Sequence, residues 1–359
     1  MTRKDFLQTV AGGALLAAAQ PGFGLSDRQA QGKMKRGVSL YSYQEEYYAR
    51  TMTLEDCIAE ASVVGAKGIE ILPTGCIPEY PNISDRWVAN WHSLMAKYNT
   101  TPSCYDIFLE MDLHRDRRLS DNEAVDMLIR DIKLAKRLGY KVLRGVNHTP
   151  LDVLEKGLPY AEQNDIRLTT EIHSPIPLDG EYVNQCMDMI QRTKTKHFGL
   201  TIDLSLFLRR PIRVMAQRAI RDGIPAPIVQ CIQDAFRQGV PKDKAQAEAE
   251  KMGYKDEDDG YGTYLMKVYD TPMQDLKKLK ALMPHVFHVH AKCWEMTEEM
   301  VEYSIPYDEI VPVLAEGGYD GYLSTEYEGQ RFTQDIAETD SCEQIRRNQF
   351  MLKKLLHEV

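Results

Sequence analysis

The sequence predicts an α/β fold, a (β/α)8 TIM barrel with a helical insertion between strands six and seven. Strand-like and helix-like segments alternate eight times after residue 33, and this alternation implies parallel strands joined by right-handed crossovers. Eight such units favour a closed barrel over an open sheet. No Gly-rich dinucleotide fingerprint follows the first predicted strand and no P-loop motif occurs, so a nucleotide-binding sheet is disfavoured.

The first half of the chain contains four predicted strand–helix units. Thr53 is a typical N-cap residue before the first helix, and Gly139 is a typical glycine after the end of the third. We expect strands at residues 36–42, 68–72, 101–107 and 141–145, and helices at residues 54–64, 87–98, 122–138 and 151–164.

The second half repeats the pattern with one interruption, because residues 209–270 are much longer than a usual connection. We expect this insertion to lie over the barrel mouth as a lid or a partner-binding surface; a tolerated surface insertion is the alternative. Within it we expect helices at 214–221, 228–238 and 242–252, and an acidic turn at 256–262. We expect the remaining strands at 167–172, 197–203, 286–290 and 322–326, and the remaining helices at 181–193, 273–282, 307–315 and 342–357.

Residues 1–32 are predicted to lie outside the barrel, which would span residues 33–359. Arg3 and Lys4 precede Phe6, Leu7 and a short apolar run at 10–19, which is the layout of an export signal. The segment resembles the twin-arginine type, with Lys4 in place of the second arginine. We therefore expect an export signal and linker, and a periplasmic or exported protein; a cytoplasmic protein with a disordered or membrane-peripheral tail is the alternative.

Composition and charge narrow the class of partner. The 359-residue chain has 43% hydrophobic and 27% charged residues, which is typical of a soluble globular domain. Its formal net charge of −9 argues against nucleic acid as the main partner, because phosphate binding requires a basic surface. Beyond the N-terminal segment, no apolar run approaches the length of a transmembrane helix. The 7 cysteines are dispersed without CxxC spacing, so we expect core residues rather than a disulfide framework.

Four apolar runs in the second half each end in a residue that can bind a metal, namely Glu171, Asp203, His290 and Glu326. The C-terminal ends of parallel barrel strands converge on one face, where the active sites of this fold are built. A mixed oxygen and nitrogen site with net negative charge suits Mn, Mg, Zn or Fe better than a soft metal. One carboxylate at a strand end is usually a helix cap or a loop residue, but ligands on four consecutive predicted strands favour a divalent-metal site.

Other polar residues on the same predicted face are candidates for contacts with a substrate. His288 and His290 share one strand face; we choose His290 as the ligand because it lies nearer the C-terminal end, and expect His288 to be a packed or hydrogen-bonded neighbour. His173 is a candidate catalytic base or substrate donor, and Lys292 a candidate for orienting a substrate oxygen, with a surface salt bridge as the alternative. Further candidates for substrate binding, with ordinary structural roles as the alternative, are Glu70, Asp106 and His148.

The candidate ligands define a class of reaction. A divalent ion chelated by a carbonyl and a neighbouring hydroxyl stabilises an enediolate, which lowers the cost of removing a proton from the adjacent carbon. A carboxylate or histidine can take that proton, and we name Glu171, Glu326 and His173 as candidates. The proton can then return to the other face, return to the other carbon, or a β-substituent can leave. The ligand set does not distinguish epimerisation, isomerisation and elimination.

From about Lys35 to the C-terminus, the chain resembles the xylose isomerase-like TIM barrels, the sugar phosphate isomerase/epimerase superfamily. The motifs that carry this resemblance are GIEIL (68–72), TEIH (170–173), TID (201–203), HVHAK (288–292) and GYDGYLSTEYEG (318–329). The resemblance implies metal ligands on strands five to eight at Glu171, Asp203, His290 and Glu326. In the ketose 3-epimerases of this superfamily the two glutamates also transfer the proton. Their pattern has a histidine three residues after the aspartate, where this chain has Leu206.

The first third looks like the large subunit of C-glycoside deglycosidases, on the segments GVSLYSYQEEYY (37–48), MTLEDCIAEA (52–61) and TTPSCYDIFL (100–109). This resemblance implies β-elimination from 3-oxo-glucosides, a divalent metal, and a small β-sandwich partner subunit from a separate polypeptide. Manganese is the first candidate metal, with Mg, Zn, Co or Fe as alternatives, and we expect an oligomer. The alternative functions are an epimerase or isomerase of a free ketose or keto-inositol, and a non-catalytic sugar-binding barrel.

Overall fold

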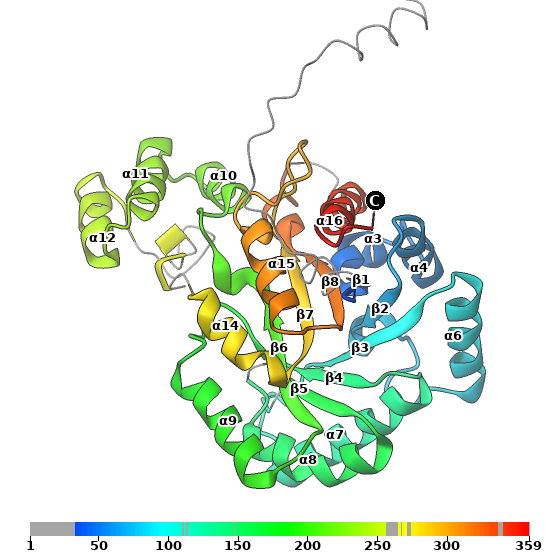
Figure 1. Cartoon of the computed structure of the whole chain (residues 1–359). Helices are drawn as coiled ribbons and strands as arrows, with labels where there is room; N and C mark the ends of the chain where they lie inside the picture. The colour runs from blue at the N-terminus through cyan, green and yellow to red at the C-terminus, as the bar shows by residue number, and fades with distance from the viewer. Residues whose placement is uncertain are drawn as a thin grey trace, which may run out of the picture.

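The computed structural model describes residues 33–109, 111, 112, 114–146, 148–255, 265, 266, 268–270, 274–336 and 340–358. Its eight parallel strands form a closed barrel in which each strand pairs with its neighbours in the sequence and β1 pairs with β8 (Figure 1). The predicted TIM barrel is therefore confirmed. The strands are β1 (Lys35–Ser39), β2 (Gly68–Ile71), β3 (Thr101–Ile107), β4 (Val142–Gly145), β5 (Arg167–Ile172), β6 (Phe198–Asp203), β7 (Val286–Cys293) and β8 (Tyr322–Tyr327).

The strand register sets the candidate ligands at one end of the barrel. Asp203, the last residue of β6, pairs with His290 of β7. One step further round the barrel, Lys292 of β7 pairs with Glu326 of β8. Because all the strands run in the same direction, these residues meet at the C-terminal end of the barrel, as expected for an active site in this fold.

Helices surround the barrel, and several begin where the sequence indicates. Thr53 and Asp56 form a capping box at the start of α4, and Ser120 and Glu123 form another at the start of α7. Gly139 has a φ of +87°, the conformation expected of a glycine after a helix end. The described α-helices outside the expected insertion at residues 209–270 are α3 (Gln44–Tyr48), α4 (Leu54–Val63), α5 (Pro73–Cys76), α6 (Asp85–Lys97), α7 (Asp121–Arg137), α8 (Leu151–Asn164), α9 (Glu181–Thr193), α14 (Leu276–Leu282), α15 (Tyr307–Glu316) and α16 (Ser341–Leu355).

The segment after β1 differs from the prediction of a strand over 36–42. The strand ends at Ser39, and the chain turns into a 3-10 helix, η1 (Leu40–Tyr43). Ser42 explains the turn, because its hydroxyl donates to Thr325 O and accepts from Tyr327 N, which fastens the segment to β8. These partners are almost 300 residues away in the sequence, so a local pattern does not contain them.

The expected insertion at residues 209–270 contains α10 (Arg213–Arg221), α11 (Ala226–Arg237) and α12 (Lys242–Lys251). They match the three helical pieces expected in this connection. A second hydrophobic cluster, which includes Ile228, Val229 and Ile232 of α11 and Ala245 and Ala249 of α12, is separate from the barrel core. In Figure 1, α11 and α12 project away from the barrel while α10 stays close to it. The expected acidic turn at 256–262 and the expected export signal at 1–32 lie outside the described residues.

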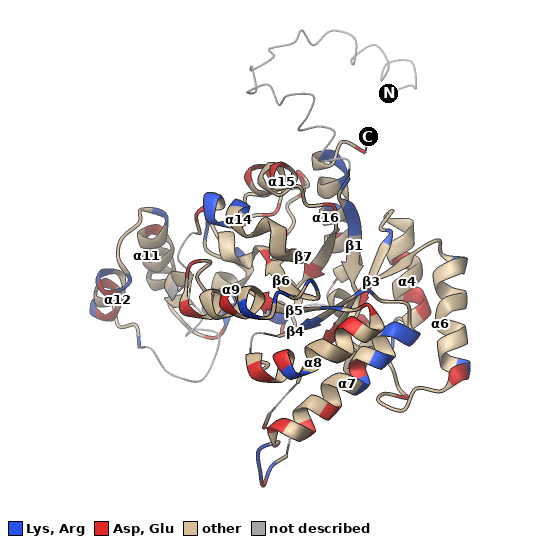
Figure 2. Ribbon diagram, turned by 60° about the horizontal axis from the view of Figure 1, so that its bottom comes forward, with Lys and Arg blue, Asp and Glu red and all other residues tan. Residues whose placement is uncertain are grey.

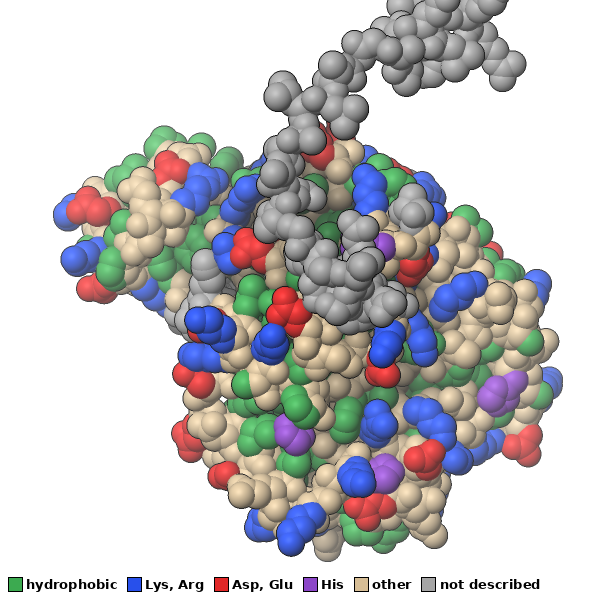
Figure 3. Space-filling model, viewed as in Figure 1, with side chains coloured by type: hydrophobic (Ala, Val, Ile, Leu, Met, Phe, Trp, Pro, Cys, Tyr) green, Lys and Arg blue, Asp and Glu red, His purple; other side chains and the backbone are tan. Residues whose placement is uncertain are grey.

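The surface is mixed in charge. Figure 2 shows acidic and basic side chains interspersed on helices such as α7 and α8, and Figure 3 shows both signs scattered over one face. Among the described residues, no helix is long and apolar enough to cross a membrane. All 7 cysteines are free thiols.

Candidate metal centre

Four side chains from four consecutive strands meet at the C-terminal end of the barrel. Glu171 (β5), Asp203 (β6), His290 (β7) and Glu326 (β8) are all buried, and their potential ligand atoms lie within 4.8 Å of one another. Nδ1 of His290 faces the carboxylates, at 2.8 Å from Glu171 Oε1, 3.3 Å from Glu326 Oε2 and 3.6 Å from Asp203 Oδ2. The structure thus brings together the four residues that the sequence marked as metal ligands.

The donor set fits a divalent cation. Three carboxylates and one imidazole nitrogen form the mixed oxygen and nitrogen environment that Mn, Mg, Zn and Fe accept. Asp203 Oδ2 is buried and accepts no hydrogen bond of normal geometry from the described residues. Although burial by itself lowers the pKa of His290, the Glu326, Glu70 and Glu171 carboxylates raise that pKa well above its ordinary value. The cluster therefore attracts positive charge at this point, whether a proton or a metal ion carries it.

Lys292 provides one fixed cation beside the cluster. Its Nζ lies 2.6 Å from Glu326 Oε2, 3.0 Å from Asp203 Oδ2 and 2.9 Å from Glu328 Oε2. Only 7% of the residue is exposed, and it lines the cavity above the cluster. It therefore does not form the surface salt bridge considered as the alternative, and its contact with a substrate oxygen stays a prediction.

Arg144, at the end of β4, provides a second buried cation that sequence reasoning missed. Its Nε lies 3.1 Å from Asp106 Oδ1, and its Nη1 lies 3.4 Å from Glu171 Oε2. Burial alone would raise the pKa of Glu171, but Arg144 and His290 outweigh it and hold that pKa at about 2. Glu171 is therefore ionised at neutral pH. The sequence did contain a signal for this residue, because Arg144 lies near the end of a short apolar strand. A charge buried there requires a partner of opposite charge.

Asp106, expected to contact sugar hydroxyls, is 1% exposed and pairs with Arg144, although it also lines the cavity. The pair with Arg144 is one of the structural roles that the sequence left open, and a contact with substrate stays a prediction. His148 and His173 both line the cavity, and His173 Nδ1 lies 2.5 Å from the Ser174 carbonyl oxygen. Both histidines are thus on the expected face of the barrel.

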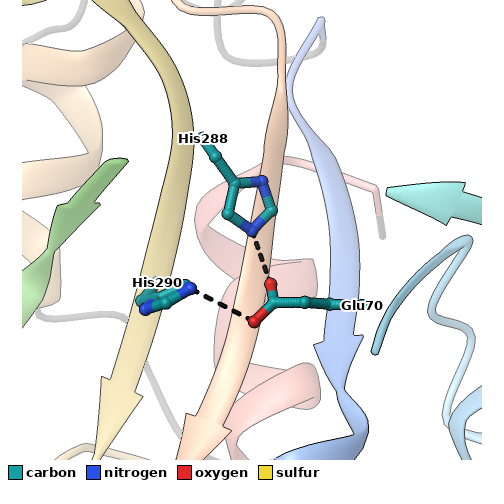
Figure 4. Close-up of side chains that lie close together, drawn as sticks. All are labelled: Glu70, His288 and His290. Atoms are coloured by element: carbon teal, nitrogen blue, oxygen red, sulfur yellow. Dashed lines mark hydrogen bonds and ion pairs between the residues drawn. The ribbon is translucent and has the colours of Figure 1, made fainter. Parts of the chain in front are cut away.

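Glu70 is placed differently from the expected substrate contact (Figure 4). It is 0% exposed, and it is absent from the residues that line the cavity. One of its carboxylate oxygens lies 2.5 Å from Nε2 of His288 and the other lies 3.1 Å from Nε2 of His290. Burial tends to raise the pKa of Glu70, but the two histidines lower it well below its usual range. Glu70 is therefore an anionic partner of His290 on the side away from the other carboxylates. This is the structural role that was considered as the alternative to a substrate contact. His288 is the packed, hydrogen-bonded neighbour that we expected.

The cavity above the cluster has a volume of about 750 Å³. Acidic and basic side chains form its base, and apolar side chains from the connections after β6, β7 and β8 form much of its wall. Glu328, which pairs with Lys292, also lines it, and sequence reasoning did not single out this residue. The volume lies within the range of about 300–1,000 Å³ that is usual for small-molecule sites.

Comparison with known protein families identifies the family to which this chain belongs. The model of the xylose isomerase-like TIM barrel family matches residues 58–354. The chain belongs to this family. Within it, the chain is 27% identical over 342 residues to a C-glycoside deglycosidase alpha subunit from Arthrobacter globiformis, covering 93% of this chain and 96% of the relative. It is also 27% identical to a 3'-dehydrocarminate deglycosidase alpha subunit from a Microbacterium species, covering 82% of this chain and 88% of the relative.

Solved structures of other proteins share the fold. An L-ribulose 3-epimerase has a TM-score of 0.55 at 13% identity, covering 90% of this chain and 95% of that chain. The IOLI protein with a bound zinc atom has a TM-score of 0.54 at 13% identity, covering 90% of this chain and 99% of that chain. At these identities the likeness establishes the architecture and leaves the reaction open.

Proposed function

We propose that this chain is the large subunit of a divalent-metal-dependent lyase that cleaves 3-oxo-glycosides by β-elimination. The observation that carries the proposal is the buried set of Glu171, Asp203, His290 and Glu326, at the base of a cavity of about 750 Å³. The similarity to deglycosidase alpha subunits along nearly the whole chain supports the choice of reaction.

Glu171, Asp203, His290 and Glu326 would hold the ion, which supplies Lewis-acid stabilisation of negative charge on substrate oxygen. Manganese is our first choice, and Mg, Zn, Co and Fe are the alternatives. These residues would hold the ion at the base of the cavity, and substrate would enter the cavity past His148, His173 and Lys292, which line it.

The chain's own residues would carry the proton transfer. The 3-oxo group acidifies the hydrogen at C2, and an acceptor at Glu171, Glu326 or His173 takes that proton. The electron pair of the C2–H bond forms the C1=C2 double bond, and the C1–aglycone bond breaks with its electrons going to the aglycone. A proton donor in the cavity then neutralises the aglycone. Lys292 would orient the substrate oxygens through its buried ammonium group.

The relatives are named alpha subunits, and on this basis we propose that the chain assembles with a second, smaller polypeptide. A small β-sandwich chain is the candidate. We also propose export through the N-terminal segment at residues 1–32, with a cytoplasmic location as the alternative.

The test is aglycone release by protein purified from its native host, so that any partner chain stays bound. Metal content is measured by mass spectrometry, and 3-oxo-glucosides are followed by chromatography. We expect bound divalent metal and aglycone release that stops after chelation and returns after metal is added back. A metal-loaded protein that releases no aglycone but exchanges the α-hydrogen of a free ketose in D₂O is instead an epimerase or isomerase. A protein with neither metal nor turnover is a sugar-binding barrel.

A further inference from the structure

The wall of the cavity differs in chemistry from its base. The base consists of charged side chains on strand ends, such as Arg144, Glu171 and Lys292. On the side of the connections after β6, β7 and β8, apolar side chains form much of the wall, and they come from the residues around η2 (Leu204–Phe207) and the start of α10, from η3 (Val268–Asp270), and from the segments after β7 and β8. They are Leu208, Ile212, Met215, Val268, Trp294 and Phe332. A cavity divided in this way fits a ligand with a polar part and an apolar part.

Helix α10 contributes to this wall although its companions α11 and α12 stand away from the barrel (Figure 1). Ile212, directly before α10, and Met215, in its first turn, are 5% and 8% exposed and line the cavity. Ile220, near the end of the same helix, is 40% exposed and is absent from the cavity lining. The N-terminal part of α10 therefore faces the cavity, and the C-terminal part presents an apolar side chain elsewhere.

Ion pairs on either side hold α10 in this position. Arg213 pairs with Glu295 in the segment after β7, with its Nε 2.9 Å from Glu295 Oε2, and its guanidinium lies 4.3 Å from the Tyr303 ring centroid. Arg221 pairs with Asp335 in the segment after β8, at 2.6 Å, and also donates to the carbonyl of Phe332. The apolar wall is thus attached to the same connections that supply Trp294 and Phe332, whose rings lie 6.0 Å apart.

We propose that Ile212 and Met215, together with Leu208 and Phe332, form a subsite for an apolar aglycone. The sugar part of the same glycoside would lie over the charged base. This proposal rests on the proposed function and adds the residues that select the leaving group. A monosaccharide alone fills only part of 750 Å³, and it offers little apolar surface to such a wall.

The experiment compares phenyl 3-oxo-β-glucoside with methyl 3-oxo-β-glucoside, which differ only in the aglycone. For the double variant Ile212→Ala/Met215→Ala, we expect the ratio of kcat/KM for phenyl over methyl to fall by about 10–100-fold, because contacts with a few methylene groups have effects of this size. Ile220→Ala is the matched control on the same helix, and its ratio should equal that of the wild type. An unchanged ratio in the double variant overturns the subsite.

Both variants are checked by circular dichroism and thermal melting. If the double variant does not fold, Met215→Trp decides, because it fills the subsite instead of emptying it. A lower phenyl-to-methyl ratio supports the proposal, and an unchanged ratio overturns it.

Binding separates failure of the subsite from failure of the proposed function. Calorimetry with the unoxidised phenyl and methyl β-glucosides requires no turnover. If the wild type cleaves neither 3-oxo-glucoside but binds the phenyl glucoside at least 10-fold more tightly, and the double variant loses this preference, the lyase proposal fails and the subsite stands. If the wild type cleaves and binds both glucosides equally well, the subsite fails and the lyase stands.

Discussion

The two halves of the barrel contribute different parts of one buried charge cluster. The second half supplies the four candidate ligands from β5 to β8. The first half supplies Glu70, Asp106 and Arg144 from β2, β3 and β4, which lie behind or beside those ligands. The candidate ligands offer donor atoms, while Arg144 adds counter-charge to that of Lys292 and Glu70 orients His290. The difference teaches that a candidate metal site depends on more than its donor atoms, since buried partners also fix their charge and direction.

Removal of a ligand from the second half should have the largest effect. We expect His290→Ala and Glu326→Ala to abolish stoichiometric metal binding and to lower kcat/KM at least about 1,000-fold, because metal coordination supplies several kcal/mol of transition-state stabilisation. Metal analysis and aglycone release measure the two effects. Glu316→Ala is the control, since Glu316 pairs with Lys280 on the surface. Unchanged metal content and turnover in both ligand variants would eliminate the metal centre.

Removal of Arg144, the buried cation from the first half of the barrel, should mainly lower the free energy of unfolding. Arg144→Met leaves Asp106 and Glu171 buried without their counter-charge, and breaking such a buried pair costs about 3–5 kcal/mol. Urea unfolding of the metal-free protein measures this loss. Arg192→Met, which breaks the exposed pair with Glu155, should change the free energy of unfolding little. Equal effects of the two substitutions would mean that burial of Arg144 is unimportant.

Removal of the Glu70 charge beside His290 should have an intermediate effect, which we expect on metal affinity. Glu70→Gln keeps the size of the side chain but removes the charge that faces Nε2 of His290. We expect metal affinity to fall about 10–100-fold, as is usual when a carboxylate that orients a ligating histidine is lost. Competition with a chelator measures the affinity. Retained affinity would show that the strand geometry alone orients His290.

The smallest effect should come from an exposed pair of an arginine and a glutamate in the first half, namely Arg117 and Glu123 of α7. Arg117 and the N-H and hydroxyl groups of Ser120 lower the pKa of Glu123 to about 2, from an ordinary value of 4.5. A lowered carboxyl pKa stabilises the fold above pH 4.5, and this contribution is lost as the pH falls towards 2. Urea unfolding of the wild type and Glu123→Gln should therefore differ slightly at pH 6 and less at pH 3. A difference that grows on acidification would contradict the assigned pKa.

Much of the site could be predicted because its signals are local. The apolar runs before Glu171 and Asp203 define strands, and alternation along a strand places His290 and Lys292 on one face. The expected lysine turned out to be buried between three carboxylates, which no local pattern reveals. For Glu70 the sequence left substrate binding and a structural role both open, because it does not show how deeply a strand residue lies in the barrel.

By itself, the sequence determined the eight strand–helix units and the types of residue at the ends of β5 to β8. Hydrophobic periodicity and capping residues act over a few positions, and the strand–helix units can be predicted from such local signals alone. The tertiary structure alone decided that Arg144 faces Glu171, that Glu70 lies behind His290, and that α10 joins the cavity wall. The contact of Glu70 with His290 depends on closure of the barrel, which brings β2 and β7 together, and the other two depend on side-chain directions and helix packing that local sequence does not contain.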